Sequence, residues 1–136
     1  MKILFLCVAN SARSQMAEGL AKYILGSNFT IESAGSQPSD RVHQDAITVM
    51  KEEAIDISNN ASKFYDELPV TFLSDLDYII TLCAEEVCPT MASNAKRLHW
   101  GMPDPAAAPE FERLKSFRTI RDQIKAKLIE FKQGFC

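Results

Sequence analysis

Two short apolar runs most constrain what this chain can fold into. They are Lys2–Cys7 (KILFLC) and residues 77–82 (DYIITL). A strand with one solvated face alternates apolar and polar residues, whereas a strand covered on both faces is apolar throughout. Both runs therefore predict strands buried in the middle of a parallel sheet.

Helix patterns alternate with these strands along the chain. Residues 14–25 predict a helix because Met16, Leu20 and Ile24 recur every four positions, and apolar spacings of three and four predict a long final helix over 114–131. Strands alternating with helices predict an α/β fold, in which one parallel sheet is covered on both faces. Weaker patterns predict strands at 29–34 and Lys96–His99, and a helix that Asp40 would cap and that would end near Glu53.

Length, charge and hydropathy narrow the class of protein. The 136 residues fit a single domain, 1–136, with one core. Nucleic acid is not an expected partner, because the net charge is −3 and the basic residues are scattered rather than gathered on one face. No apolar run is long enough to cross a membrane, and the apolar start is too short for a secretion signal. We therefore expect a cytoplasmic protein.

The loop after the first predicted strand carries the main chemical signal. Residues 7–14 (CVANSARS) join a cysteine, five intervening residues and an arginine to the start of a helix. Backbone N–H groups of such a loop, with the helix N-terminus, can cradle an anion and stabilise a thiolate at Cys7. Arg13 offers a planar fork for two oxygens of a tetrahedral oxyanion. The segment therefore predicts a thiol nucleophile in an oxyanion site.

Three further side chains could support this loop. The hydroxyl groups of Ser11 and Ser14 can donate to the thiolate or the anion, and Asn10 can hold a strained loop through side-chain-to-backbone hydrogen bonds. The simpler alternative makes Cys7 a small core residue and Arg13 a surface charge. The order of strand, loop and helix favours the oxyanion site.

The other cysteines suggest redox chemistry. Four cysteines without a secretion signal are too sparse for a disulfide scaffold. If the strand at 77–82 neighbours the first strand, Cys83 and Cys7 lie at adjacent strand ends, close to disulfide range. With Cys88, they suggest a relay: one thiol attacks the oxyanion, a second resolves the adduct and a third takes over the disulfide. No role is predicted for Cys136.

Two other interpretations of these cysteines stay open at the level of sequence. Cys83 and Cys88 could bind zinc with His99, although a second pair of ligands is missing. They could also be two buried structural cysteines. The spacing alone does not separate these interpretations from the relay.

Asp104 is the candidate acid. It lies in the rigid loop 100–105 (WGMPDP), from which it could protonate a leaving oxygen, although an Asp-Pro pair by itself more often starts a turn. We expect His43 to be structural or at the surface. We expect Arg118 and Arg121 to lie on the solvated face of the final helix.

The chain resembles the low-molecular-weight tyrosine phosphatase superfamily, and within it the arsenate reductases that regenerate through thioredoxin. The matching stretches cover most of the chain in family order: CVANSARSQMAEGLAKYILG, ESAG, KEEAIDISNNASK, DYIITLC with CP following, and HWGMPDPA. The resemblance implies a flavodoxin-like four-stranded parallel sheet with helices on both faces.

The resemblance also implies roles for the candidate residues. Cys7 would attack arsenate, Arg13 would clamp the oxyanion, Asp104 would be the general acid, and Cys83 and Cys88 would form the resolving pair. Arsenate would be reduced and released as arsenite. A thioredoxin-type partner would then reduce the last disulfide, with glutaredoxin and glutathione as the other option. We expect no bound cofactor, a required external thiol reductant and a monomer.

Some members of this superfamily bind a potassium ion beside the nucleophile loop. The matching residues here are Asn10, Glu18 and Ser33, but the position of the remaining aspartate ligand is Lys63. Lysine has donors and a fixed positive charge but no acceptor. We therefore expect no metal. The Lys63 ammonium could take the place of the ion, paired with Glu18 and donating to Asn10, or it could equally turn into solvent.

Two competing functions remain. A phosphotyrosine phosphatase would use Cys7, Arg13 and Asp104 in the same way and would need neither Cys83 nor Cys88. Phosphatases of this type place aromatic residues after the Asp-Pro pair, where this chain has three alanines. A non-catalytic thiol sensor or anion-binding module is the alternative from another class.

Overall fold

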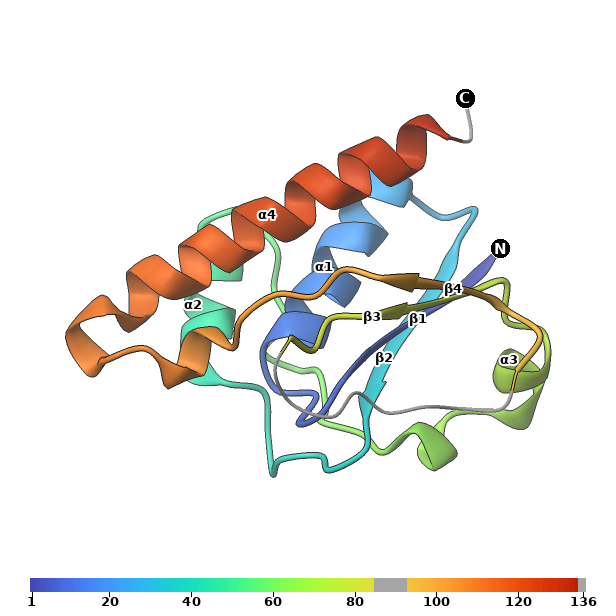
Figure 1. Ribbon diagram of the computed structural model, residues 1–136, viewed down its shortest axis with the longest axis horizontal. Helices are drawn as coiled ribbons and strands as arrows, with labels where there is room; N and C mark the ends of the chain where they lie inside the picture. The colour runs from blue at the N-terminus through green and yellow to red at the C-terminus, as the bar shows by residue number, and fades with distance from the viewer. Residues whose placement is uncertain (85–92, 135–136) are drawn as a thin grey trace.

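The computed structural model describes residues 1–84 and 93–134, and Cys88 and Cys136 lie outside these ranges. The predicted α/β fold is confirmed: four parallel strands form one sheet in the order β2-β1-β3-β4, with helices on both faces (Figure 1). The strands are β1 (Lys2–Cys7), β2 (Thr30–Gly35), β3 (Tyr78–Thr81) and β4 (Lys96–His99). Two of them, β1 and β4, have the predicted bounds.

The helices differ in length and in the face that they cover. The main ones are α1 (Arg13–Leu25), α2 (Gln44–Lys51), α3 (Val70–Ser74) and α4 (Arg113–Gln133). Three short 3-10 turns complete the described elements: η1 (Tyr65–Glu67), η2 (Pro105–Ala107) and η3 (Glu110–Glu112). Within the described ranges, no helix is both long and apolar enough to span a membrane.

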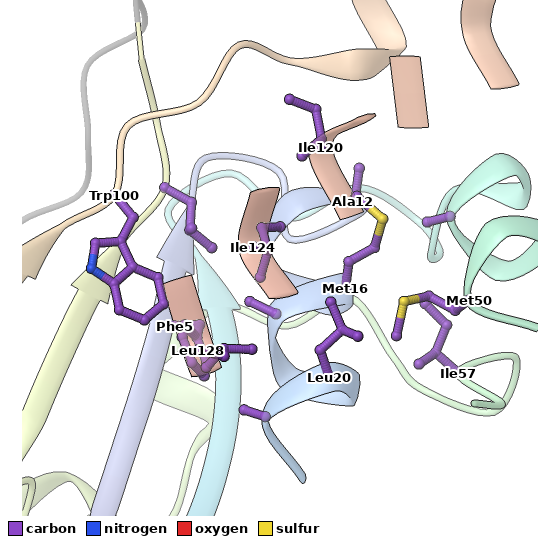
Figure 2. Close-up of a cluster of buried hydrophobic side chains, with 14 of the residues drawn as sticks. Phe5, Ala12, Met16, Leu20, Met50, Ile57, Trp100, Ile120, Ile124 and Leu128 are labelled. Atoms are coloured by element: carbon purple, nitrogen blue, oxygen red, sulfur yellow. The ribbon is translucent and has the colours of Figure 1, made fainter. Parts of the chain in front are cut away.

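The strand β1 is buried on both faces, as its continuous apolar run predicts. Ile3 and Phe5 belong to the large core beneath α1, α2 and α4, whereas Leu4 and Leu6 belong to a smaller core with Phe72 of α3. Figure 2 shows the large core, in which side chains of α1 and α4 meet above the sheet. This double burial makes β1 a rigid base for the loop that follows it.

The start of α2 was predicted wrongly. The helix begins at Gln44, and its cap is His43, whose Nδ1 accepts from the backbone N–H of Asp45 at 3.0 Å. The ring of His43 also packs on Phe117, with ring centroids 4.8 Å apart. Asp40 therefore does not cap the helix. The expected structural role of His43 matches these contacts.

The expectation for Arg121 was also wrong, because its side chain is largely buried between α2 and α4. Its guanidinium donates to the Val49 carbonyl oxygen at 2.9 Å and to Glu52 Oε1 at 2.7 Å. Arg118 is exposed, as expected, and donates to Glu52 Oε2 at 2.8 Å. Hydrogen bonds from Arg118 and then Arg121 lower the pKa of Glu52 to about 2. Ion pairs thus join the end of α2 to α4.

Candidate active site

The loop that follows β1 lies at the topological switch point of the sheet. Its strand has β2 on one side and β3 on the other, so loops after β1 and β3 leave the same edge toward opposite neighbours. The end of β2 lies against the loop so closely that a side-chain carbon on Gly35 would collide with the Val8 carbonyl oxygen. Glycine is therefore required at the end of the ESAG stretch.

Residues 37–43 hold the nucleophile loop from outside. Across a trans peptide bond the C=O of one residue and the N–H of the next point in opposite directions. The N–H groups of Ala9, Asn10 and Ala12 therefore face away from the 37–43 segment, where a bound anion can use them. The bonds that fix the preceding carbonyl groups run from Gln37 N to Val8 O (2.9 Å), Ser39 N to Ala9 O (3.0 Å) and His43 N to Ser11 O (2.8 Å).

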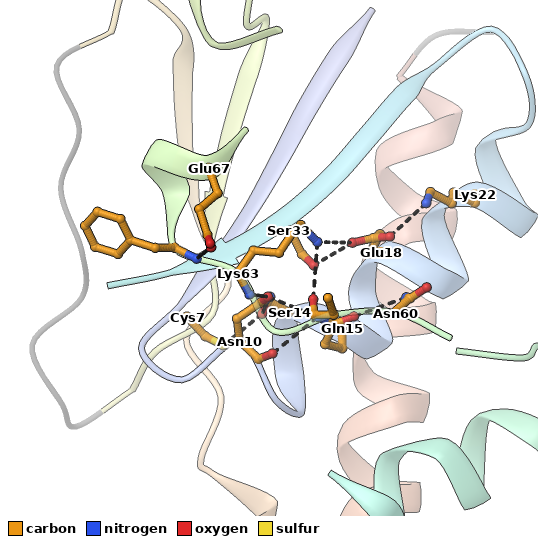
Figure 3. A network of polar contacts seen from close by, with 12 residues as sticks. Cys7, Asn10, Ser14, Gln15, Glu18, Lys22, Ser33, Asn60, Lys63 and Glu67 are labelled. Carbon is orange, nitrogen blue, oxygen red and sulfur yellow. Dashed lines mark hydrogen bonds and ion pairs between the residues drawn. The ribbon is translucent and has the colours of Figure 1, made fainter. Parts of the chain in front are cut away.

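Cys7 is a free, buried thiol at the end of β1. Its Sγ lies 2.9 Å from Ser14 Oγ, and Asn10 Nδ2 donates to the same hydroxyl oxygen at 2.8 Å (Figure 3). Because Ser14 Oγ accepts the proton of Asn10, its own proton is left to point at the sulfur. This arrangement directs a hydrogen-bond donor at the Cys7 sulfur. Ser11 stays at the loop surface, on the rim of a hollow shared with His43 and Asn60.

Asn10 has a left-handed backbone, with φ of 49°. Asparagine tolerates this region better than most residues, and here its side chain is held by several bonds. Its Oδ1 accepts from the backbone N–H of Lys63 at 2.8 Å and from Gln15 Nε2 at 3.0 Å. Sequence reasoning missed Gln15, because a single polar residue in a helix pattern carries no sign of being buried.

Arg13 connects the nucleophile loop to two other segments of the site. Its guanidinium is buried and donates to the Met102 carbonyl oxygen at 2.9 Å and to the Leu82 carbonyl oxygen at 3.5 Å. Leu82 immediately precedes Cys83, and Met102 lies two positions before Asp104. The predicted clamp, resolving cysteine and acid therefore come from segments that Arg13 holds together.

Cys83 lies where the sequence placed it. The strands β1 and β3 are adjacent, with Leu6 opposite Thr81, so Cys7 and Cys83 follow neighbouring strand ends. Cys83 is fully buried and disulfide-bonded, whereas Cys7 is a free thiol. The predicted role of Cys88 also falls outside the described residues.

Asp104 is exposed and caps the turn η2. Its Oδ1 accepts from the backbone N–H of Ala106 at 3.0 Å, so the turn interpretation of the Asp-Pro pair is correct. Its loop is anchored to the neighbouring strand ends by a bond from Met102 N to the Leu82 carbonyl oxygen at 3.1 Å, and by the bond from Arg13. The acid role of Asp104 stays a prediction.

The oxygens of Glu18 and Asn10, which match ligands of a potassium site, meet protein donors. Both carboxylate oxygens of Glu18 meet protein donors: Ser33 Oγ donates to Oε1 at 2.5 Å, and Lys22 Nζ donates to Oε2 at 2.7 Å (Figure 3). The Lys63 ammonium lies 3.9 Å from Glu18 Oε1. Asn10 Oδ1 accepts from the Lys63 backbone N–H, however, and not from its ammonium, which lies 3.4 Å from the Ala61 carbonyl oxygen.

The zinc interpretation gains no support within residues 1–84 and 93–134. No cluster of three or more His, Cys, Asp and Glu side chains occurs among them. His99 lies beside β3, with Nδ1 at 2.7 Å from Thr81 Oγ1. One of the three ligands considered, Cys88, lies outside the described residues.

The fold and the loop define a class of protein, and the comparisons name it. The chain belongs to the low molecular weight phosphotyrosine protein phosphatase family, whose model matches residues 2–134. Within this family, the chain is similar to proteins named arsenate reductases. Arsenate reductase 2 of Staphylococcus haemolyticus is 42% identical over 132 residues, which cover 96% of this chain and 95% of the relative.

Solved structures show the same likeness. An arsenate reductase in the phosphate binding state is 32% identical, with a TM-score of 0.81 and coverage of 99% of this chain and 98% of that one. A thioredoxin-dependent arsenate reductase of Corynebacterium glutamicum is 26% identical, with a TM-score of 0.72, covering 98% of this chain and 60% of that chain. The predicted superfamily is thereby confirmed.

Proposed function

We propose that this protein reduces arsenate to arsenite, with Cys7 as the nucleophile. The observation that carries the proposal is the Cys7 sulfur, buried beside the Ser14 hydroxyl at the base of an anion loop, with a second cysteine at the neighbouring strand end. Relatives named arsenate reductases support the choice of oxyanion. A thiol nucleophile alone would serve a phosphatase equally well.

The first step forms a bond between sulfur and arsenic. The Cys7 thiolate attacks the arsenic(V) atom, and an arsenate oxygen leaves as water after Asp104 supplies a proton. Arg13 and the loop N–H groups hold the remaining oxygens. The Arg13 guanidinium would move from its carbonyl acceptors toward the oxyanion, since charged acceptors bind a guanidinium more strongly than neutral ones.

The second step reduces the arsenic. The Cys83 thiolate attacks Cys7 Sγ, a sulfur–sulfur bond forms, and the electron pair of the sulfur–arsenic bond passes to arsenic, which leaves as arsenite. Cys88 then attacks Cys83 and frees Cys7. A thioredoxin-type dithiol supplies the two electrons that reduce the last disulfide.

A phosphotyrosine phosphatase is the second candidate, favoured by the family to which the chain belongs. It would use Cys7, Arg13 and Asp104 without any disulfide. The segment after Asp104 is the turn η2, made of proline and alanine, which offers no aromatic surface to a substrate ring. A thiol sensor or anion-binding module would retain the loop but turn over neither substrate.

The remaining features of the proposal concern cellular context. We propose a cytoplasmic monomer that holds no cofactor of its own and draws electrons from thioredoxin, because thioredoxin dependence is named for a structural relative. Glutaredoxin with glutathione is the other reductant to be tested. Each disulfide in the relay forms between cysteines of the same chain, so only the last one needs an external thiol.

The experiment measures arsenate-dependent consumption of NADPH with thioredoxin and thioredoxin reductase, beside a parallel assay with glutaredoxin and glutathione. We expect turnover with thioredoxin. Phosphate-ester hydrolysis without arsenate turnover in either assay would identify the protein as a phosphatase instead. Activity toward neither substrate would leave a thiol sensor or anion-binding module as the remaining candidate.

The relay has its own test. Cys88→Ser should complete one turnover and stall with Cys7 joined to Cys83, whereas Cys83→Ser should stall earlier without that bridge. Peptide mapping after arsenate treatment distinguishes the two products. Full turnover of the unaltered protein without a bridge between Cys83 and Cys88 at any stage would contradict the relay and favour an external thiol as resolver.

A further inference from the structure

Gln15 is a fully buried amide in the first turn of α1. Its Nε2 is surrounded by three oxygens: the Ala61 carbonyl at 2.9 Å, Asn10 Oδ1 at 3.0 Å and the Asn10 carbonyl at 3.2 Å. Its Oε1 accepts from Asn60 Nδ2 at 3.1 Å. Buried polar groups are costly unless they are bonded, and both ends of this amide are bonded.

The surroundings fix which end of the Gln15 amide points where. A reversed amide would place its oxygen against three other oxygens and lose every donor contact. The nitrogen therefore faces Asn10 and Ala61. The bond from Asn60 stabilises the same orientation from the other end. Gln15 consequently presents its donor end, and not its oxygen, to Asn10.

The donor of Gln15 in turn fixes the amide of Asn10. Asn10 Oδ1 receives two N–H groups, from Gln15 and from the Lys63 backbone, so the oxygen end must face them. The nitrogen end then faces Ser14 Oγ at 2.8 Å. An amide nitrogen donates only, so Ser14 must accept there and can direct its own proton to the Cys7 sulfur at 2.9 Å.

The reversed amide of Asn10 would have the opposite effect. Its oxygen would lie beside Ser14 Oγ and accept the hydroxyl proton, which would then no longer stabilise a thiolate at Cys7. The direction of hydrogen bonding at the sulfur thus depends on a residue that touches neither the sulfur nor the oxyanion loop's anion site. Figure 3 shows this sequence of contacts from Asn60 through Gln15, Asn10 and Ser14 to Cys7.

We infer that Gln15 is a positioning residue for the Cys7 nucleophile: its buried amide sets the direction of the hydrogen bonds that run through Asn10 and Ser14 to the sulfur. Its bond to the Asn10 carbonyl also supports the left-handed backbone of Asn10. The inference concerns the same site as the proposed function and rests on Cys7 being its nucleophile. It concerns thiolate formation, however, and this can be measured without arsenate.

The test replaces Gln15 by methionine, which has a similar length and no donor. The rate at which iodoacetamide alkylates Cys7 in the reduced protein is followed against pH, with the Cys7 peptide quantified by mass spectrometry. We expect the midpoint of this profile to rise by about half to one pH unit, which corresponds to losing one directed hydrogen bond. Gln133→Met, at an exposed glutamine of α4, is the matched control and should leave the midpoint unchanged.

A second comparison separates direction of hydrogen bonding from general loosening of the loop. Ser14→Ala should raise the midpoint by itself, and adding Gln15→Met to it should cause no further rise, because the path from Gln15 to the sulfur runs through Ser14. An additional rise as large as in the unaltered background would overturn the inference. So would an unchanged midpoint in Gln15→Met.

If Gln15→Met does not fold, Asn60→Leu provides the same test from the next residue outward. It removes only the bond to Gln15 Oε1, so we expect a smaller rise of the midpoint in the same direction. No rise in that variant would then overturn the inference. A rise of the midpoint in an enzyme that fails to reduce arsenate would count against the proposed function alone.

Discussion

Two polar clusters of this protein are built from different kinds of groups. The cluster at Cys7 is buried and consists of neutral amides and hydroxyl groups, whose hydrogen bonds have a fixed direction. The cluster between α2 and α4 consists of charges, with Glu52 bound by Arg118 and Arg121 near the surface. The first directs hydrogen bonds toward a sulfur through neutral groups, and the second holds two helices together. We therefore expect substitutions in the first to change chemistry and substitutions in the second to change stability.

Cys7→Ser should show the largest difference between an effect on activity and an effect on stability. A neutral hydroxyl is a far poorer nucleophile, so arsenate reduction and any phosphatase activity should fall by at least about 1000-fold. The melting temperature should change little, because serine is close to cysteine in size and can still meet Ser14. Steady-state assays and calorimetry are the measurements. Substantial residual turnover would remove Cys7 from the mechanism.

Asp104→Asn should lower activity less and stability hardly at all. Asparagine retains the oxygen that accepts from the Ala106 N–H, so the turn is preserved, but it cannot deliver a proton to a leaving oxygen. We expect single-turnover formation of arsenite to slow by about 100-fold while oxyanion binding persists. Asp40→Asn, at an exposed aspartate, serves as the control. An unchanged single-turnover rate would mean that Asp104 acts only in the turn.

A substitution at Lys63 allows the unaltered protein to be compared with a variant that would bind a potassium ion beside the cluster at Cys7. The unaltered protein should show no gain in melting temperature in potassium over sodium at equal ionic strength, because protein donors meet both oxygens of Glu18 and the ammonium lies nearby. Lys63→Asp should introduce a potassium-specific gain of about 3 °C at concentrations well above the dissociation constant. Lys22→Asp, which alters the other lysine on Glu18, is the matched control. A clear potassium-specific gain in the unaltered protein would refute the replacement of the ion by lysine.

Glu52→Gln should have the smallest effect and should appear only in stability. The pKa of Glu52 is lowered to about 2 in the folded protein from an ordinary value of 4.5, so its contribution is present above pH 4.5 and is lost as the pH falls toward 2. The substitution should lower the melting temperature by about 2 °C at neutral pH and flatten its decline in that acidic range. Glu110→Gln, at an exposed glutamate of η3, is the control. A loss of arsenate turnover would contradict the division between the clusters.

The sequence predicted what depends on local pattern. The apolar run of Lys2–Cys7 and the pattern of Lys96–His99 placed β1 and β4 with correct bounds, and the order of strand, loop and helix identified Cys7, Ser14 and Arg13 as neighbours in one loop. These features involve residues that are close in the chain, or a periodicity that burial imposes directly. The four-stranded parallel sheet followed from the resemblance together with the alternation of elements, but the sequence predicted no order of strands.

What the sequence did not predict depends on distant partners. The cap of α2 is His43 rather than Asp40, and the His43 N–H is bound to the Ser11 carbonyl oxygen of the nucleophile loop. Arg121 is buried because Val49 and Glu52 of another segment receive its guanidinium. Gln15 meets Asn60, which is 45 positions away. Periodicity carries no information about such pairs.

The three bonds from residues 37–43 to the nucleophile loop bear on the thermodynamics of oxyanion capture. They join backbone to backbone and need no ligand atom, so folding by itself can order the loop. Binding should then cost little conformational entropy, and the heat capacity change on binding should be small, because almost no apolar surface is newly buried. The backbone amides of Gln37, Ser39 and His43 should exchange with deuterium equally slowly with and without a tetrahedral anion.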